Sequence, residues 1–499
     1  MTDGEPTAGR STTPDPGASV APPGPTPEPP ASGVPDPSRR RFFRLLAADA
    51  IQTAAQVVGV ATALQRSSAE AAAALLDDVS RDDAAAAVEA PSSDTGRRSP
   101  FRMESDRLFV LDQGRFPFEI VEIECTTGAE VARAIRELAV RGGPAIAQVA
   151  AYGLALTAGR ARSAKPYVRL ATIRGTANAL GLARVAPAAP RAAVDRLMAR
   201  MSIVGELADA GDEIADAMRV EADAIAFETT LDNARLVDAG RAALEGLVRA
   251  AESGAAESGA AEATAASEPG VGEFPPSAER AVGEFPSAAE RAVGVLTLGS
   301  SGALAGGQVG TALGVLTAYA ATGRSIHVFV LETRPWLDGS RLAAWELVQA
   351  AVPFSILADG AAGWILASGE VDVVLVAADR VARDGSFLAP IGTFGVAVAA
   401  ASAGVPVWVC APGAAIDPGA GGVADLPGEM RAASDVLWLR GLEVAAPGAT
   451  ARNPVVDATP GDLVSAFVTD AGVFRPPFAA DLAALAAAFA TRSPAGATP

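Results

Sequence analysis

The sequence predicts an α/β protein in which a helical N-terminal domain precedes a Rossmann-like C-terminal domain with a mostly parallel sheet. After residue 293, short apolar runs rich in β-branched residues alternate with helix-like stretches, as in parallel α/β folds. These runs are apolar almost throughout, which indicates strands covered on both faces. Before residue 250, apolar residues recur at helical spacing instead, and this period predicts the helical domain.

Composition limits the possible functions. The chain has 499 residues, half of them hydrophobic, which is enough for two or three domains with sizeable cores. Its formal net charge is −18 and it has no long stripe of Lys and Arg, which argues against nucleic-acid binding. One histidine, His327, and two cysteines, Cys125 and Cys410, exclude a Cys/His zinc cluster, a histidine-based triad and a disulfide framework. The scarcity of cysteine fits a reducing compartment.

Residues 1–98 are an N-terminal extension that we predict to be disordered apart from an amphipathic helix near 41–77. The stretch SRRRFFRLL (38–46) resembles a twin-arginine export signal, but Asp49 and Gln52 interrupt the apolar region that should follow it. Two readings therefore remain open: export, or a helix that docks on a partner protein or a membrane surface. Without export, the protein is expected in the cytoplasm. No run reaches the ~18 apolar residues of a transmembrane helix.

The predicted N-terminal domain covers residues 99–250. Residues 101–113 alternate between apolar and polar side chains, which predicts a hairpin or a small sheet. Thr127 with Glu130 three positions later has the pattern of a helix start, and the helix is expected over 127–140.

The sequence Arg141-Gly142-Gly143-Pro144 must end that helix. Two glycines before a proline expose backbone N–H groups, and the neighbouring arginine makes the turn a candidate anion cradle. An ordinary Gly-Pro turn between helices explains the same residues. Arg174, in the stretch IRGTANAL (173–180), is expected at the start of a later helix.

Residues 251–292 are expected to be a low-complexity linker. AESGA occurs twice in a row from residue 251, and VGEFPPSAERA (271–281) is followed at once by VGEFPSAAERA (282–292). Tandem duplications of this kind are tolerated in exposed loops, because lengthening such a loop costs little entropy. The linker separates the helical domain from the Rossmann-like domain at 293–492, and residues 493–499 are expected to be a disordered tail.

The strongest functional candidate from the residues alone is Asp379. It ends the apolar run VDVVLVAAD (371–379), and chemistry in open parallel sheets collects just beyond the carboxyl ends of the strands. A carboxylate that caps the next helix or pairs with Arg380 fits the same position. Further upstream, the turn Gly299-Ser300-Ser301-Gly302 could hold a phosphate at a helix N-terminus. It is not a dinucleotide fingerprint.

Six motifs, taken in order, strongly resemble S-methyl-5-thioribose-1-phosphate isomerase. That enzyme shares its fold with ribose-1,5-bisphosphate isomerase and with the regulatory subunits of the eukaryotic initiation-factor guanine-nucleotide exchange factor. The resemblance covers roughly residues 101–250 and 293–480. The motifs are RGGPAIAQVAAYGLAL (141–156), IRGTANAL (173–180), VLTLGSSGALAGGQVGTALGV (295–315), ETRPWLDGSRLAAWEL (332–347), AADRVARDGSFLAPIGTFGVAVAA (377–400) and RNPVVDATPGDLVSAFVTDAGV (452–473).

The resemblance implies a helical domain packed on a Rossmann-like domain, a homodimer, and a place in methionine salvage. The implied reaction is an aldose–ketose isomerisation of a small phosphorylated sugar, without a metal or any other cofactor. In the family, a cysteine and an aspartate move the proton or hydride. The RGG turn, an arginine of the N-terminal domain, a glutamine and a lysine hold the phosphate.

Carried over position by position, Asp379 falls on the catalytic aspartate of the family. Arg141, Gly142 and Gly143 fall on the phosphate turn, and Arg174 is assigned to the second arginine. Glu332, Thr333, Arg334 and Pro335 keep the signature that follows the second strand. We therefore expect Asp379 to meet Arg141 and Arg174 in one cavity between the two domains.

The sequence departs from the family at the positions of its catalytic and substrate-binding residues. Gly299 stands where the family has its cysteine, Asp338 stands for the glutamine, and Ala389-Pro390 replaces an asparagine–lysine pair. An Asp338 carboxylate ~4 Å from a phosphate would add a repulsion of about 4 kcal/mol per pair of unit charges at an effective dielectric of ~20. Losing one member of an acid–base pair typically lowers a rate by about 10²–10⁴-fold.

Three residues are candidates to replace the missing thiol. Ser300 or Ser301 could stand near its position, but the sequence shows no base that would activate either hydroxyl. Cys410 ends a later strand at the same edge of the sheet. Either it is a relocated nucleophile or it is an ordinary buried cysteine.

Three hypotheses follow for the function. The chain is an isomerase for the family's substrate or a near relative of it. Alternatively, it is a non-catalytic protein that binds a ligand or takes part in regulation or assembly, as the exchange-factor subunits do. In the third hypothesis it acts on a substrate that lacks the phosphate or carries a cation opposite Asp338.

Overall fold

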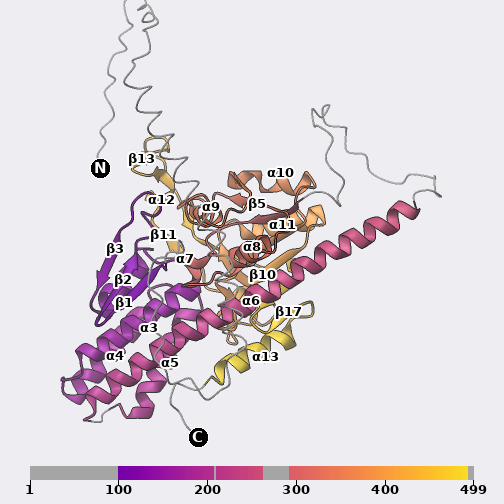
Figure 1. The fold of residues 1–499 in the computed structure, drawn as a ribbon. Coiled ribbons are helices and arrows are strands. Elements are labelled where there is room, and N and C mark those ends of the chain that lie inside the picture. Colours follow the sequence, from indigo (N-terminus) through magenta and orange to yellow (C-terminus); the bar gives the residue numbers. More distant parts are fainter. Residues whose placement is uncertain (1–98, 207–208, 262–291, 493–499) are drawn as a thin grey trace, which may run out of the picture. The chain divides into compact units, whose positions relative to one another are not determined.

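The computed structural model describes residues 99–206, 209–261 and 292–492. These residues all belong to one compact unit of the chain that begins at residue 87. The predictions for the N-terminal extension, its helix and export-like segment, the tandem repeats at 271–291 and the C-terminal tail lie outside the described residues. Figure 1 shows a helical part, coloured indigo to magenta, and a sheet with flanking helices, coloured orange to yellow.

The described chain begins with a small antiparallel sheet. Its strands are β1 (Phe101–Glu104), β2 (Arg107–Leu111) and β3 (Glu122–Cys125), in the order β1-β2-β3. The hairpin or small sheet predicted for 101–113 is confirmed, and β3 adds a third strand. Leu108, Val110 and Cys125 point into the core, as expected for strands with one buried face.

Five helices follow. They are α2 (Gly128–Arg136), α3 (Gly143–Arg160), α4 (Pro166–Gly181), α5 (Ala189–Val204) and α6 (Gly211–Ala261). The predicted start of α2 is confirmed, because Thr127 Oγ1 accepts from the Glu130 backbone N–H at 3.2 Å while the Glu130 carboxylate accepts from the Thr127 N–H at 3.0 Å. The helix ends four residues earlier than predicted, since Leu138 adopts a left-handed backbone with φ of 61°, which no α-helix accommodates.

The boundary predicted at residue 250 is wrong. Helix α6 continues to Ala261, so the first eleven residues of the expected linker are helical. The repeated AESGA units consist mainly of alanine and glutamate, two strong helix formers, and they follow directly on an existing helix, where adding residues needs no new nucleation.

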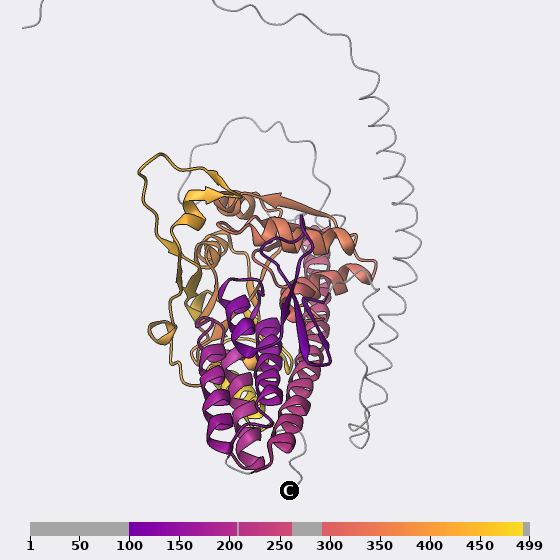
Figure 2. The same cartoon turned by 90° about the vertical axis from the view of Figure 1, so that its left-hand side faces the viewer.

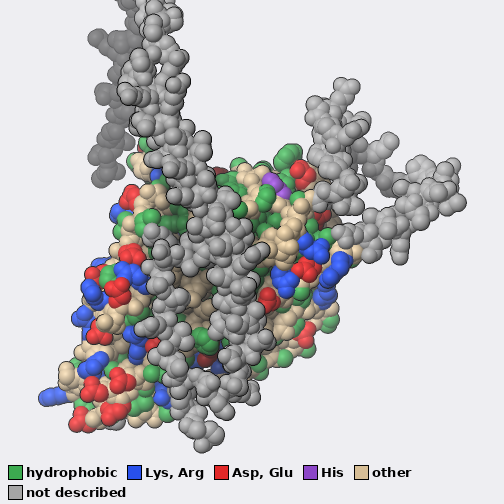
Figure 3. Space-filling model, in the orientation of Figure 1, with side chains coloured by type: hydrophobic (Ala, Val, Ile, Leu, Met, Phe, Trp, Pro, Cys, Tyr) green, Lys and Arg blue, Asp and Glu red, His purple; other side chains and the backbone are tan. Residues whose placement is uncertain are grey.

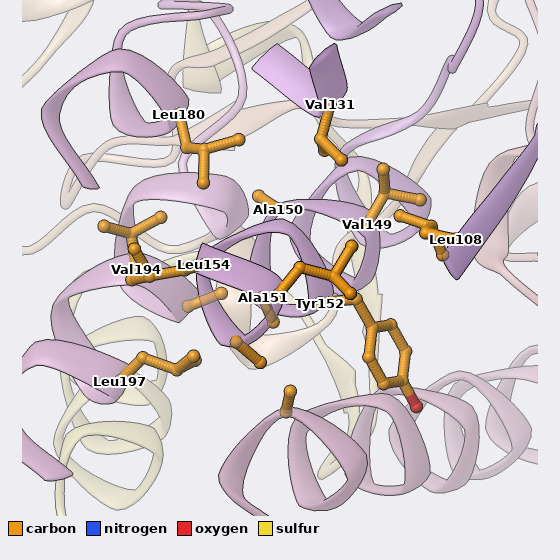
Figure 4. Packing of buried hydrophobic residues seen from close by; sticks show 14 of the residues in the cluster. Leu108, Val131, Val149, Ala150, Ala151, Tyr152, Leu154, Leu180, Val194 and Leu197 are labelled. Carbon is orange, nitrogen blue, oxygen red and sulfur yellow. The ribbon is translucent and has the colours of Figure 1, made fainter. Parts of the chain in front are cut away.

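Helix α3 is the centre of the helical part. It is buried almost all round and packs against α2, α4, α5 and α6. Figure 2 shows these helices side by side. Small residues allow the close approach: a Cβ on Gly153 would come within 2.8 Å of Val131. Figure 4 shows the resulting core around α3, which includes Leu108, Val131, Val149, Ala150, Ala151, Tyr152, Leu154, Leu180, Val194 and Leu197.

The second part contains a seven-stranded sheet in the order β17-β16-β10-β7-β4-β5-β6, in which only β17 is antiparallel to its neighbour. The mostly parallel sheet predicted from the sequence is confirmed. The strands are β4 (Val293–Thr297), β5 (Ile326–Leu331), β6 (Phe354–Leu357), β7 (Val373–Ala377), β10 (Val407–Cys410), β16 (Ala466–Thr469) and β17 (Gly472–Phe474).

Both faces of this sheet are covered. Helix α8 (Ala312–Ala321) and the later half of α6 cover one face, where Val295, Val315 and Leu244 share a core. Helices α10 (Ala362–Ala367), α11 (Thr393–Ala403) and α13 (Ala479–Ala490) contribute to the core on the other face. Because α6 also packs on α3 and α5, this single helix joins the helical part to the sheet (Figure 1).

The remaining elements lie between the strands or extend the sheet. They are α7 (Ala303–Gly306), η1 (Gly339–Ala343), α9 (Ala344–Gln349), η2 (Asp359–Ala361), β8 (Arg380–Val381), β9 (Phe387–Pro390), η3 (Gly413–Ala415), η4 (Val423–Asp425), β11 (Met430–Arg431), α12 (Ser434–Leu437), β12 (Trp438–Leu439), β13 (Leu442–Glu443), β14 (Asn453–Pro454), β15 (Val456–Thr459) and η5 (Gly461–Leu463). Strands β15, β9 and β8 form a small antiparallel sheet.

The surface adds two observations. On the face in Figure 3, acidic and basic side chains are interspersed and do not gather by sign. Within the ranges that the structure describes, no helix has the length and apolarity needed to cross a membrane.

Candidate functional site

Asp379 lies directly after β7, at the carboxyl end of that strand, as the sequence predicted. Strand β4 neighbours β7, and the chain runs outward from this pair in opposite directions, through β5 and β6 on one side and through β10 and β16 on the other. This is the strand order of the dinucleotide-binding fold, and ligands bind such sheets where the order reverses. Asp379 therefore stands at the switch point of the sheet.

A cavity of about 40 Å³ opens at this point. Since a water molecule needs about 10–15 Å³ of such volume, the cavity in this conformation has room for a few water molecules. Its wall combines the start of α3 with the ends of β4, β7, β9 and β10. It includes Gly142, Gly143, Pro144, Ala189, Leu298, Ser300, Ser301, Ala305, Thr311, Ala377, Ala378, Asp379, Pro390, Pro412 and Ala415.

The surroundings of Asp379 favour its neutral form. Burial raises the pKa of the Asp379 carboxyl, Arg184 acts in the opposite direction, Glu429 raises the pKa further, and Arg380 lowers it. The net direction is upward, so burial outweighs the two cations. A carboxyl that keeps its proton at higher pH than usual is suited to donating a hydrogen bond or a proton.

This shift predicts the effect of removing the charge. Because the native state holds the Asp379 proton more tightly than the unfolded chain does, protonation stabilises the fold, and stability falls as the pH rises from the unfolded pKa through the native pKa. Asp379→Asn should therefore raise the free energy of unfolding at pH 7 by about 0.5–2 kcal/mol, the usual range for stabilising substitutions at functional sites. Urea unfolding between pH 4 and 8 measures this.

The matched control is Asp106→Asn in the exposed turn between β1 and β2, which should leave stability unchanged within about 0.5 kcal/mol. Equal stability of wild type and Asp379→Asn across the whole pH range would contradict the predicted linkage.

The cations that act on Asp379 are not the two that were predicted. Arg184, which sequence reasoning missed, lies in the loop before α5, and its Nε is 2.6 Å from Oε1 of Glu429. The useful signal was its position in a loop, because binding residues concentrate in loops held by a rigid scaffold. Arg184 thus acts electrostatically on Asp379 but, like Arg174, is not among the residues that line the cavity.

Arg174 was predicted to lie at a helix start, and this is wrong. Its predicted place beside Asp379 finds no support either. Arg174 lies inside α4, not at a helix start, and 56% of its side chain is exposed. Its Nη2 is 2.6 Å from a carboxylate oxygen of Glu206. It does not line the cavity. The sequence motif gave no indication of which face of the helix this side chain would occupy.

Arg380 holds the loop that carries Arg184. Its guanidinium donates to the backbone carbonyl of Val185 at 2.9 Å and of Ala186 at 3.0 Å, and it is paired with Asp417. The Ala188 N–H in turn donates to the carbonyl of Asp379 at 3.0 Å. The helical part and the sheet are therefore joined by hydrogen bonds at the site itself.

The predicted Gly142-Gly143 turn opens α3 onto the cavity. Gly142 has φ of 82°, and a Cβ there would overlap Ala305, so both the conformation and the contact require glycine. Asp379 Oδ1 would be 3.9 Å from a Cβ on Gly143. The start of α3, which is the positive end of the helix dipole, therefore lies beside the Asp379 carboxyl.

Arg141, the arginine of this turn, is paired with Asp338 and is not among the residues that line the cavity. Its Nη1 lies 2.7 Å from Oδ2 of Asp338, and only 8% of its side chain is exposed. Oδ1 of Asp338 lies 3.5 Å from Nη2 of Arg341. The expectation that Arg141 and Arg174 meet Asp379 in one cavity finds no support, because neither arginine is among the residues that line the cavity.

Gly299 and Pro390 are in contact. Gly299 has φ of 78°, and a Cβ built on it would lie 2.9 Å from Cγ of Pro390. Its N–H donates to Oγ1 of Thr333 at 2.9 Å. The ring of Pro390 therefore occupies the space that a side chain at position 299 would need.

The turn from Gly299 to Gly302 does not present a free helix N-terminus. Helix α7 is only four residues long, and its first N–H groups, on Ala303 and Leu304, donate to the carboxylate of Glu346 at 2.6 and 3.4 Å. The carboxylate of Glu346 therefore takes the N–H groups of α7 that the predicted phosphate would use, and a phosphate at the rest of the turn stays a prediction. Ser300 and Ser301 do line the cavity.

Neither cysteine lies at the cavity. Cys410 is fully buried in β10, and burial raises its pKa strongly. Cys125 is buried in β3, and burial raises its pKa to about 11. Both are protonated, enclosed thiols. Of the two alternatives for Cys410, the structure supports the ordinary buried cysteine.

The fold and site define the class of protein: a Rossmann-like α/β protein with a cavity at the switch point of its sheet, lined in part by the start of α3. The family model described as "Initiation factor 2 subunit family" matches residues 139–476. A methylthioribose-1-phosphate isomerase from Anaeromyxobacter sp. (strain K) is 38% identical over 383 residues, which cover 77% of this chain and 95% of that protein. One from Pelotomaculum thermopropionicum is 35% identical over 371 residues, 74% of this chain and 89% of that protein.

The chain therefore belongs to the methylthioribose-1-phosphate isomerase and initiation factor 2 subunit family. Two solved structures agree. The 5-methylthioribose 1-phosphate isomerase of Pyrococcus horikoshii OT3 superposes with a TM-score of 0.62 at 27% identity, covering 80% of this chain and 98% of that one. The translation initiation factor eIF-2B subunit delta of A. fulgidus superposes with a TM-score of 0.58 at 27% identity, covering 78% and 99%.

Proposed function

We propose that this chain is a non-catalytic member of the family, which keeps the fold and a ligand cavity but does not isomerise methylthioribose-1-phosphate. The contact between Gly299 and Pro390 carries the proposal. By resemblance these positions belong to the catalytic cysteine and to the phosphate-binding lysine. A Cβ on Gly299 would approach Pro390 Cγ to 2.9 Å, well inside ordinary van der Waals contact. The packing of Pro390 thus leaves no room for a cysteine side chain at position 299.

Among the described residues that line the cavity, none is a cysteine or a lysine. Neither Cys125 nor Cys410 lines the cavity, and both thiols have raised pKa values because they are buried. Lys165 is the only lysine of the chain and immediately precedes α4. Asp379 remains as a lone carboxyl. Without its partner, an acid–base step typically slows by about 10²–10⁴-fold, and the loss of phosphate contacts weakens substrate binding in addition.

An isomerase assay tests the proposal. The purified full chain is incubated with methylthioribose-1-phosphate, and formation of the ketose is followed by NMR, with the Anaeromyxobacter relative as the positive control. We expect conversion at the buffer rate for this chain and rapid conversion by the relative. Turnover above buffer that Asp379→Asn abolishes would overturn the proposal. The homodimer and the cytoplasmic location implied by the resemblance stay predictions.

A further inference from the structure

The arginine beside the start of α3 is already neutralised by the protein. Arg141 and Asp338 form an ion pair of 2.7 Å, with only 8% and 14% of their side chains exposed. Arg141 also lies over the ring of Trp336, 5.3 Å from its centroid. A buried pair of this kind is costly to open, because both charges would lose a partner away from bulk water. An incoming anion would have to displace Asp338 to reach Arg141.

Arg341 is the second cation next to Asp338, and its guanidinium is already engaged, so it is not free to bind an incoming anion in place of Arg141. Its guanidinium donates to the backbone carbonyls of Gln113, Gly114, Phe116 and Trp336 at 2.7–3.0 Å. Only its Nη2 turns towards Asp338. Arg341 therefore serves the backbone, and Asp338 is the single carboxylate between two guanidinium groups.

Two further acidic side chains lie where a ligand anion could bind, next to the N-termini of helices. The N–H groups that begin α7 donate to Glu346. The start of α3 lies beside Asp379. Arg141 and the start of α7 thus each have an acidic side chain of this chain beside them, Asp338 and Glu346. A phosphate dianion at either place would meet that carboxylate at short range, and like charges repel strongly in a partly buried site.

What remains in the cavity are groups that recognise hydroxyls. Oγ of Ser300 is buried and has no hydrogen-bond partner among the described residues, and Ser300 lines the cavity together with Thr311 and Asp379. A hydroxyl and a carboxyl are donors and acceptors suited to a polyol or sugar. We propose that the cavity takes a small hydroxylated ligand without a phosphate group, and that Asp338 is the residue which sets this specificity.

This inference rests on the proposed function only for the location of the ligand. Its test is a binding titration of the full chain, by calorimetry at pH 7, with methylthioribose and methylthioribose-1-phosphate as a matched pair. Wild type is expected to bind the phosphorylated sugar no more tightly than the unphosphorylated one. Asp338→Asn should gain at least tenfold in affinity for the phosphorylated sugar, because Arg141 is then uncompensated. Adding Arg141→Gln should abolish that gain.

Asp195→Asn is the control, since its carboxylate pairs with Arg191 on the exposed side of α5 and should leave the preference unchanged. Binding of the phosphorylated sugar by wild type at least tenfold more tightly than the plain sugar would overturn the inference, whether or not the chain turns it over. Absence of any gain in a folded Asp338→Asn variant would overturn it as well. Isomerase turnover, in contrast, bears on the proposed function alone.

Discussion

Gly299→Cys, the substitution that restores the family's thiol, is expected to lower the free energy of unfolding by about 2–5 kcal/mol. Two costs add. A side chain in the left-handed region costs about 1–2 kcal/mol, and Gly299 has φ of 78°. Overpacking against Pro390, whose Cγ would lie 2.9 Å from the new Cβ, costs about 1–3 kcal/mol. Urea unfolding under reducing conditions measures the sum.

Two variants separate these costs. Gly369 has φ of 79° but nothing within 4 Å of its would-be Cβ, so Gly369→Cys should show the backbone cost alone. Gly299→Cys/Pro390→Ala removes the clashing Cγ, and a double-mutant cycle should give a favourable coupling of about 1–2 kcal/mol. Equal destabilisation by Gly299→Cys and Gly369→Cys, with no coupling to position 390, would show that Pro390 does not fill the site of the thiol.

Arg341→Ala should destabilise the fold by about 3–5 kcal/mol. Arg341 donates to four backbone carbonyls, three of them in the loop after β2, and only 8% of its side chain is exposed. Its removal leaves these acceptors and Asp338 underpaired in a buried region, which is among the most costly kinds of substitution. Chemical unfolding at pH 7 measures the loss.

Arg341→Lys keeps the charge but lacks the planar fork that reaches several acceptors at once, so its stability should be intermediate. Arg191→Ala removes an exposed guanidinium that pairs only with Asp195 along α5, and it should cost less than about 1 kcal/mol. A change of under about 1 kcal/mol for Arg341→Ala would contradict the role of Arg341 in tying the loop after β2 to the sheet.

Much of the fold followed from local patterns. Apolar β-branched runs predicted the parallel strands, and Thr127 with Glu130 predicted the capping box that α2 contains. Asp379 was found because strand polarity brings the carboxyl ends of parallel strands to one edge. The end of α6 was missed, since low complexity was taken as a sign of a linker although alanine and glutamate favour helix.

The errors at the site have a common physical cause. Arg174 and Arg184 lie ten positions apart, yet one is exposed on α4 and the other acts on Asp379. Nothing in the sequence indicated that Asp338 pairs with Arg141, and the structure shows this ion pair. In each case the outcome depends on which side chain a distant segment presents, and periodicity carries no information about that.

By itself the sequence determined the layers of this protein, the edge of the sheet where Asp379 stands, and the absence of a cysteine at position 299. These follow from the local order of apolar and polar residues. Only the tertiary structure decided that Arg184 acts on Asp379, that Asp338 neutralises Arg141, and that Pro390 fills the space beside Gly299. Such contacts join segments far apart in the chain, and they are set by how the helical part packs on the sheet.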